Sequence, residues 1–265
     1  MSEDGKGEAI PGAGGHQPIF MIPGVIVVLG GLMLAIHLAA SLILNQEGQL
    51  NLIIWFGVIP KRLIAPGEVP GGLLPLLWSP ITYAFLHAGW DHVIGNVVWL
   101  AIFGTPVARR YGPVPTLIIF AVSSILGAVA LVITSLNGVG YLIGASGGVA
   151  GLTGAGMRFM FQPVIVTKHP ETGETIVLGR QMATIRQMLA NPTARNFSIF
   201  WIVANCLVPI LPLVIGQQIE IAWQAHLAGF FTGLFLAPLF ERPARNIPSA
   251  PPAGPDERSQ TPPSS

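Results

Sequence analysis

The chain has 265 residues, of which 51% are hydrophobic and only 9% are charged. Its mean hydropathy of +0.64 lies outside the range of ordinary soluble domains and indicates a membrane protein. The net charge of +1 gives no reason to expect a nucleic-acid partner, and a single cysteine excludes a disulfide within the chain.

Two polar segments flank the apolar part of the chain. Residues 1–18 are rich in Gly and residues 241–265 are dominated by Pro and Ser, and neither composition can bury enough apolar surface to fold. We expect two disordered cytoplasmic tails around a membrane domain at residues 19–240. The first apolar run, residues 19–44, has no Lys, Arg, Asp or Glu and is too long for a signal-peptide core, so we expect it to be retained as a span.

Six apolar segments are long enough to cross the membrane as helices, since about 20 residues span the roughly 30 Å hydrocarbon layer. They are residues 19–44, 80–104, 114–135, 143–161, 197–216 and 220–240. The turn signal SLNGVGYLIG separates the third from the fourth. We therefore predict an all-α membrane protein built as a six-transmembrane-helix bundle.

Two of the connections are long enough to have structure of their own. Residues 45–79 contain NLIIWFGVIP, whose apolar and aromatic residues favour a partly embedded interfacial element in an outer loop. An insertion at about residues 162–195 contains VIVTKHPETGETIVLG, residues 164–179, which alternates around a PETG turn. This pattern predicts a small cytoplasmic β-hairpin.

With six crossings, the basic residues fall mostly on one side of the membrane. That side has Lys6, Arg109, Arg110, Arg158, Lys168, Arg180, Arg186, Arg195, Arg242, Arg245 and Arg258, whereas only Lys61 and Arg62 fall on the other. Because cytoplasmic loops carry the excess of Lys and Arg, we predict that both termini are cytoplasmic. We expect the protein in the plasma membrane, the inner membrane of a bacterium.

Polar residues within membrane spans are expensive and usually functional. At 1.5 Å per residue, Ser146, Asn96 and His226 each lie about 18 to 24 Å from the arginine at the inner end of their span. Three residues far apart in sequence thus reach a similar level in the outer half of the bilayer. His92 precedes Asn96 by four residues, so these two side chains share a helix face.

Rows of small residues indicate that two of the spans pack closely. The fourth span has Ser146, Ala150 and Gly154 on one face and Gly147, Gly151 and Ala155 beside them, and the sixth has Ala225, Gly229 and Gly233. If these faces meet, the Ser146 hydroxyl can come within hydrogen-bond reach of the His226 imidazole, about 2.6 to 3.2 Å, as a base-activated serine requires. A serine on the first turn of a helix also has free N–H groups beside it, which can hold an oxyanion.

Taken singly, most of these residues have simpler interpretations. Ser146 could bond a carbonyl of its own helix, and His92 with Asn96 could join two helices. His226 could be a satisfied interior histidine or belong to a proton relay. His37, Asn205 and Asp91 are expected to be structural, Asn205 by binding a neighbouring helix and Asp91 by capping its span. GASGG also fits the GxSxG elbow of soluble hydrolases, but that motif needs a preceding strand.

Three motifs together resemble those of the rhomboid family of intramembrane serine proteases. HAGWDHVIGN matches HxxxxHxxxN in the second span, GASG matches GxSG in the fourth and AHLAGFFTG matches AHxxG in the sixth. The resemblance implies a dyad of Ser146 as nucleophile and His226 as general base. It implies an oxyanion hole of His92, Asn96 and the Ser146 N–H, with His87, Gly144 and Gly147 in support, and neither cofactor nor metal.

The chain departs from the rhomboid pattern at three places. Ala150 stands where the family often has an aromatic residue beneath the histidine, and Ala108 stands where many relatives have Glu. The family's Trp-Arg pair of the first outer loop is absent as a pair, although Trp55 and Arg62 are present. These departures leave open what orients the His226 ring.

We expect an intramembrane serine endopeptidase that cleaves the transmembrane segments of membrane-protein substrates near the outer face. Two alternatives remain at this point: an inactive rhomboid-like protein that binds membrane clients, and a small-solute transporter using His226 and Asn96. The sequence predicts partners in the lipid bilayer and among transmembrane proteins, and it predicts no oligomeric state.

Overall fold

The computed structural model of the chain describes residues 21–135, 140–169, 172–207 and 222–241, and most of these residues are helical. The tails predicted at residues 1–18 and 241–265 lie outside the described residues except for Glu241. Within the described ranges, three helices are long and apolar enough to cross a membrane: α1 (Gly24–Ile43), the continuous helix Trp90–Tyr111 and α7 (Pro113–Thr134).

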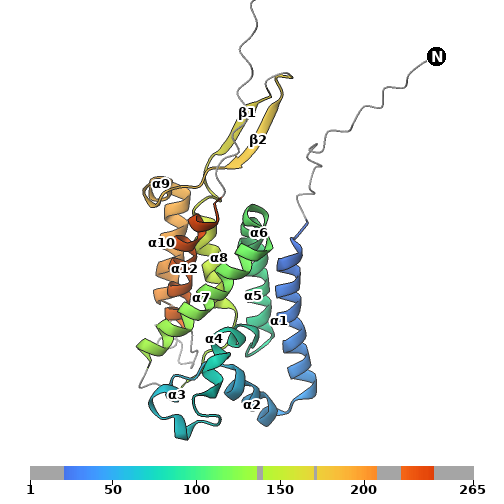
Figure 1. The fold of residues 1–265 in the computed structure, drawn as a ribbon, viewed down its shortest axis with the longest axis vertical. Coiled ribbons are helices and arrows are strands. Elements are labelled where there is room, and N and C mark those ends of the chain that lie inside the picture. Colours follow the sequence, from blue (N-terminus) through green and yellow to red (C-terminus); the bar gives the residue numbers. More distant parts are fainter. Residues whose placement is uncertain (1–20, 136–139, 170–171, 208–221, 242–265) are drawn as a thin grey trace, which may run out of the picture.

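The main helices run in alternate directions along the chain (Figure 1). In order they are α1, α5 (Trp90–Trp99) continued through a π-helical turn at Leu100–Gly104 into α6 (Thr105–Tyr111), α7, α8 (Ser146–Met157), α10 (Pro192–Leu207) and α12 (Trp223–Leu236). A 3₁₀ turn at Ala237–Phe240 follows α12. Each of the six predicted spans therefore contains a helix, although several ends differ from the prediction.

The predicted start of the second span at residue 80 is wrong. The chain forms a short helix, α4 (Ser79–Thr82), and a 3₁₀ turn at Tyr83–Phe85, and the long helix begins only at Trp90. The break has a local cause, because Leu86 and Gly89 adopt extended conformations that a helix cannot include. His87 therefore lies in an extended segment rather than in a span.

The fifth helix also begins earlier than predicted, at Pro192 instead of residue 197. The Asn191 side chain accepts hydrogen bonds from the backbone N–H groups of Thr193 (3.0 Å) and Ala194 (3.2 Å), and proline is favoured at the first position of a helix. The first turn of α10 thus falls inside the insertion predicted at about 162–195. The end of the predicted fifth span lies outside the described residues.

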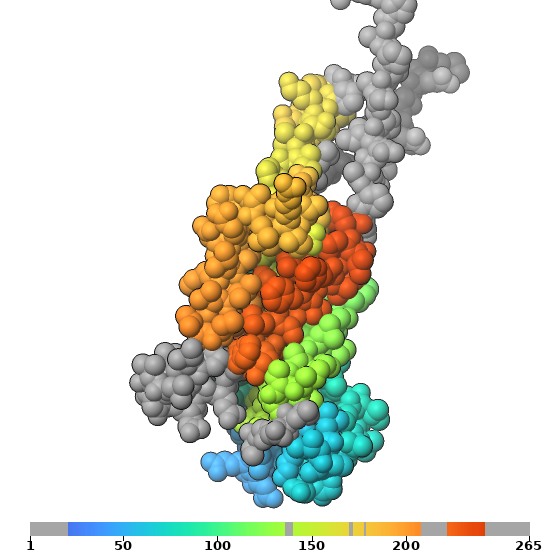
Figure 2. All heavy atoms as spheres, turned by 90° about the vertical axis from the view of Figure 1, so that its left-hand side faces the viewer, coloured from blue at the N-terminus to red at the C-terminus, as the bar shows by residue number. Residues whose placement is uncertain are grey.

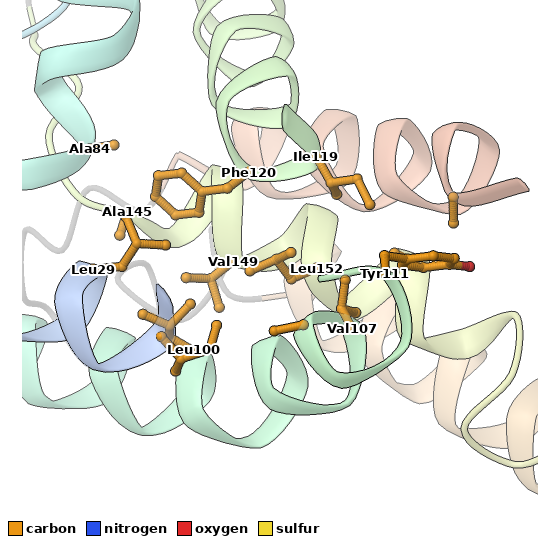
Figure 3. Packing of buried hydrophobic residues seen from close by; sticks show 14 of the residues in the cluster. Leu29, Ala84, Leu100, Val107, Tyr111, Ile119, Phe120, Ala145, Val149 and Leu152 are labelled. Atoms are coloured by element: carbon orange, nitrogen blue, oxygen red, sulfur yellow. The ribbon is translucent and has the colours of Figure 1, made fainter. Parts of the chain in front are cut away.

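Helix α8 lies at the centre of the bundle, with every residue from Gly147 to Met157 buried. Val149 and Leu152 of α8 pack among apolar side chains from the surrounding helices, including Leu100 and Phe120 (Figure 3). The many glycine and alanine residues of α8 let the neighbouring helices pack closely against it. These eleven buried residues carry no charge, as expected inside a membrane domain, where the backbone groups between the two end turns of a helix bond within that helix.

The predicted contact between the small-residue rows is confirmed. A Cβ atom on Gly229 would overlap the carbonyl oxygen of Gly147, and a Cβ atom on Gly233 would overlap that of Gly151. Helices α8 and α12 therefore touch backbone to backbone. This close approach brings the start of α8 to the start of α12.

Residues 46–82 cover one end of the bundle, which we call the loop end (Figure 1). They form α2 (Gln46–Phe56), α3 (Lys61–Ile64), 3₁₀ turns at Pro66–Glu68 and Leu74–Leu77, and α4. Arg62 is fully buried among them and donates hydrogen bonds to the carbonyls of Ile54, Pro70 (2.6 Å) and Gly72 (2.9 Å). Burial lowers the pKa of Arg62, and the three carbonyls replace the water that its charge has lost.

The opposite end of the bundle, the hairpin end, has the predicted β-hairpin. Strands β1 (Val164–Lys168) and β2 (Thr175–Arg180) pair antiparallel and project from the bundle (Figures 1 and 2). Arg110 of α6 links the hairpin to the residue that follows the last 3₁₀ turn. It donates to the Arg180 carbonyl (2.8 Å) and pairs with Glu241 (2.6 Å). A short helix, α9 (Ile185–Ala190), connects the hairpin to α10.

Arg158 follows α8 at the hairpin end, but it is not a solvated loop charge. Its side chain is buried and donates to the carbonyls of Ala183 and Leu234, both at 2.8 Å. The guanidinium thus ties the end of α8 to α12 and to the segment before α9. An arginine counted as a topology signal in the sequence is also a packing element of the fold.

Candidate active site

Ser146 is the first residue of α8, and the segment before it is held on both sides. Val58 and Leu142 form an isolated antiparallel bridge with hydrogen bonds of 3.1 and 2.8 Å, and the Gly144 N–H donates to the Tyr83 carbonyl (2.9 Å). No side chain among the described residues caps this helix end. The N–H groups of the first turn therefore have no partner within the helix and point beyond its N-terminus.

Gly144 is required by the shape of this segment. Its φ of +112° lies in the region that L side chains rarely adopt. A Cβ atom at this position would also lie 2.6 Å from Nε2 of His92. Glycine thus allows the His92 ring to lie directly against the backbone that leads into Ser146.

Ser146 and His226 are in hydrogen-bond contact across the α8–α12 interface. His226 is in the first turn of α12, and its Nε2 lies 2.7 Å from the Ser146 Oγ. The contact depends on the glycines below it, because Gly147 and Gly229 let the two helix starts approach. A serine hydroxyl paired with an imidazole at this distance can be deprotonated as it attacks an electrophile.

Two polar side chains of α5 face the same site. Asn96 is buried and donates from Nδ2 to the His92 carbonyl (3.0 Å), and both residues line the cavity that contains Ser146. The His92 Nδ1 accepts a long hydrogen bond of 3.4 Å from the Ala88 N–H. That bond favours the tautomer in which Nε2 of His92 carries the proton, so this nitrogen is a donor next to Gly144.

His87 supports the backbone before Ser146. Its Nε2 accepts a hydrogen bond of 3.4 Å from the Ala145 N–H, and its ring packs edge-on against His92 with centroids 5.0 Å apart. Gly147 lies on the other side, where a Cβ atom would be 3.0 Å from the Tyr83 hydroxyl. The residues that the sequence analysis nominated for the site therefore lie together around the start of α8.

A cavity of about 290 Å³ opens beside the Ser146–His226 pair. It is lined by Asp91, His92, Gly95, Asn96, Trp99, Ser146, Val149, Ala150, Trp201, Asn205 and His226. It has room for several water molecules, each of which occupies about 30 Å³ in the liquid. Among the described residues, no group of three or more His, Cys, Asp or Glu has an arrangement that could hold a metal ion.

The family model of the Rhomboid domain matches residues 75–243, which is more than half of the chain. The chain belongs to the rhomboid family. It is 22% identical over 180 residues to RHOMBOID-like protein 5 of Arabidopsis thaliana, covering 68% of this chain and 47% of that protein. It is 28% identical over 165 residues to RHOMBOID-like protein 1 of the same plant, covering 62% and 34%.

A bacterial relative, the putative rhomboid protease YdcA of Bacillus subtilis, is 33% identical over 78 residues, which cover 29% of this chain and 38% of that protein. The chain spans half or less of the length of these curated relatives. Together with its long apolar helices, family membership makes this rhomboid an integral membrane protein.

Asn205 also lies at the site in this rhomboid, although the sequence analysis expected it only to bind a neighbouring helix. Oδ1 of Asn205 lies 2.7 Å from Nδ1 of His226, and Nδ2 of Asn205 donates to the Trp201 carbonyl (2.8 Å). Ala150 lines the same cavity without reaching the ring as an aromatic residue would. The signal that could have revealed Asn205 was a lone amide in an apolar helix. The direction in which its side chain points could be known only from the tertiary structure.

His37 and Asp91, which the sequence analysis expected to be structural, are not hydrogen-bonded to Ser146 or His226. His37 of α1 packs edge-on against Trp90 with ring centroids 4.8 Å apart, and the Ser41 hydroxyl bonds the His37 carbonyl (2.8 Å). Asp91 lies at the start of α5, where a carboxylate complements the helix dipole, and it also lines the cavity. In place of an adjacent Trp-Arg pair, this rhomboid uses the buried Arg62 to organise its first loop.

Proposed function

We propose that this rhomboid is an intramembrane serine endopeptidase. The observation that carries the proposal is the 2.7 Å contact between Ser146 Oγ and His226 Nε2 beside a cavity large enough for water. A serine that only satisfied its own helix would bond a carbonyl one turn back, as Ser124 does with Phe120 (2.9 Å) and Ser198 does with Ala194 (2.8 Å). Ser146 instead faces a base on another helix.

The proposed reaction is hydrolysis of a peptide bond in two steps. Ser146 attacks the carbonyl carbon while His226 takes the hydroxyl proton, and His226 then protonates the leaving amine. Water, deprotonated by the same imidazole, then attacks the acyl carbon, and the imidazolium returns that proton to Ser146 Oγ as the bond from Oγ to the acyl carbon breaks. The oxyanion of each tetrahedral intermediate is held by the Ser146 N–H together with His92 and Asn96, and losing one such donor typically lowers the rate by about 10²- to 10³-fold.

We infer that the protein crosses the membrane six times with its hairpin end in the cytoplasm. With the hairpin end in the cytoplasm, the loop end would face outward. The start of α8 lies next to the loop end, because Leu142 pairs with Val58. Substrates would be transmembrane segments of other proteins, cut near the outer face. Because a helical carbonyl is already hydrogen-bonded, segments weakened by Gly or other poor helix formers near that boundary should be preferred. A bacterial plasma membrane is the expected location.

The test is cleavage of a transmembrane substrate by the purified protein reconstituted in lipid vesicles. We expect Ser146→Ala and His226→Ala each to lower the cleavage rate by at least about 10³-fold, since either loss disables the pair. Ser41→Ala is the matched control, because its hydroxyl only bonds its own helix, and it should cleave at the wild-type rate. Equal cleavage by wild type and Ser146→Ala would refute the proposal.

A serine-directed phosphonate probe removes the dependence on choosing the right substrate. Labelling of the wild type and not of Ser146→Ala supports an activated serine even where a test substrate resists cleavage. If a folded wild-type sample takes up no label, the protein is better described as a rhomboid-like binder of membrane clients.

A further inference from the structure

We propose that Asn205 is the positioning residue of the site, fixing both the orientation and the tautomer of His226. This inference rests on the proposed protease function and adds a third member to the Ser146–His226 pair. It also answers the question that Ala150 raises, since a hydrogen bond from α10 would do what an aromatic ring beneath the histidine often does in the family.

The amide of Asn205 can have only one orientation at this place. Nδ2 donates to the Trp201 carbonyl one turn earlier in α10, at 2.8 Å, which leaves Oδ1 facing the His226 ring at 2.7 Å. The reverse orientation would set Oδ1 against a carbonyl oxygen, two acceptors with no proton between them. Oδ1 is therefore an acceptor toward Nδ1, and Nδ1 must carry the ring proton.

The tautomer follows from this assignment and matches what the chemistry needs. A neutral imidazole has one N–H and one lone pair, so a proton on Nδ1 leaves the lone pair on Nε2. Nε2 is the nitrogen that lies 2.7 Å from Ser146 Oγ. When His226 takes the serine proton, Asn205 keeps its hydrogen bond to the ring, and bonds to charged groups are stronger than neutral ones.

The helices that hold this contact are themselves clamped together one turn away. Trp201 precedes Asn205 by four residues in α10, and Phe230 follows His226 by four in α12, and their rings stack with centroids 4.6 Å apart. In the surface view, α10 (orange) and α12 (red) lie side by side (Figure 2). Asn205 thus acts from a helix that packs against α12 rather than from a loop.

The experiment measures kcat and KM separately for Asn205→Ala, Asn205→Leu and Asn205→Asp in lipid vesicles. We expect the Ala and Leu variants to lose roughly 10- to 100-fold in kcat with little change in KM, because each lacks the acceptor for the Nδ1 proton. Asn205→Asp keeps an acceptor for the Nδ1 proton but sets its second oxygen against the Trp201 carbonyl, so it should recover only part of the lost kcat. Cys206→Ala, an exposed neighbour in α10, is the control and should match the wild type.

A spectroscopic measurement tests the tautomer without any substrate. Nitrogen-15 NMR of the imidazole groups, with His226 assigned by its absence in His226→Ala, should show a protonated Nδ1 and an unprotonated Nε2 in the wild type. Asn205→Leu should mix the two tautomers. An unchanged tautomer together with a wild-type kcat in the folded Ala and Leu variants would overturn the inference.

The two proposals fail in different ways. If Ser146→Ala abolishes cleavage but the Asn205 variants cleave normally, the protease assignment stands and the role of Asn205 is wrong. If wild type and Ser146→Ala cleave at the same rate, the protease assignment is wrong. The NMR result still decides whether Asn205 fixes the tautomer of the His226 ring. If Asn205→Ala only lowers the melting temperature and its folded fraction has the wild-type kcat, Asn205 is a helix contact and the inference fails.

Discussion

Gly144 shows how one residue controls the geometry of the whole site. The chain must turn from the Leu142 bridge into α8 within a few residues, and a φ of +112° makes that turn. The same position must leave space for the His92 ring, which approaches to 2.6 Å of where a Cβ atom would lie. Two independent requirements, one of conformation and one of space, therefore select glycine.

At this scale we expect Gly144→Ala to inactivate the protein with little effect on its fold. The backbone strain is about 1 to 2 kcal/mol, and relief of the overlap moves His92 or the start of α8 by a fraction of an ångström. Proteolytic activity should fall at least about tenfold, since displacements of this size strongly affect positioned groups. Gly67→Ala, where the loop end leaves open space, should retain full activity in the same assay.

Most residues that meet at the candidate site could be nominated from the sequence, because a polar residue in an apolar span is conspicuous. Ser146, His226, His92 and Asn96 stand out from the sequence for that reason. Asn205 stands out equally, yet its partner could not be named. Whether an amide meets a histidine or a backbone carbonyl depends on the rotation of α10 about its axis, and packing against α12 sets that rotation.

At the scale of helices, the contact between α8 and α12 determines whether the dyad forms. The glycine rows put two backbones in direct contact, so the distance between Ser146 and His226 is set by the helix separation rather than by flexible side chains. The hydroxyl and the imidazole lie on the first turn of each helix. A small change in helix separation is therefore transmitted fully to the reacting groups.

We expect Gly233→Ala, two turns from the dyad, to reduce both stability and activity. Its Cβ atom would overlap the Gly151 carbonyl, and neither backbone can move aside as a side chain could. The expected loss of stability is about 1 to 3 kcal/mol, as for other overpacked cores. Melting in detergent micelles and the cleavage rate measure the two effects. Gly31→Ala in α1 meets nothing within 4 Å and should be neutral or slightly stabilising.

The helix ends were the least predictable feature at this scale. The apolar run from residue 80 suggested a span, but the helix starts at Trp90 because Leu86 and Gly89 are extended, and the 3₁₀ turn before them packs against α1 and α8. Hydropathy records which residues avoid water. It does not record where the chain turns inside a protein interior that is equally apolar.

For the whole molecule, the distribution of basic residues predicts the orientation in the membrane. Arg109 and Arg110 end α6, and Lys168 and Arg180 lie in the hairpin, so these charges belong to elements at the hairpin end (Figure 1). Some of them also bind protein groups, as the Arg110–Glu241 pair shows. Both roles are compatible with a cytoplasmic hairpin end.

We expect cysteine labelling in intact bacterial cells to reach only the loop end. In a Cys206→Ala background, Gly67→Cys should react with a membrane-impermeant maleimide, because the predicted topology puts residue 67 outside the cell. Thr172→Cys, beside the hairpin turn, should react only after the cells are permeabilised. Labelling of Thr172→Cys and protection of Gly67→Cys would contradict the predicted topology.

The sequence by itself determined the class of protein, its mostly helical character and the residues from which a site could be made. It did so because hydropathy, small-residue spacing and isolated polar residues can be read directly along the chain. A polar residue in contact with lipid is also costly, so the few polar residues in the spans stand out. Tertiary structure decided how closely the Ser146 hydroxyl approaches His226, and it alone decided that Asn205 meets the other side of the same ring. Those contacts join α8, α10 and α12, and the rotation and separation of packed helices arise from the fit of all their side chains at once.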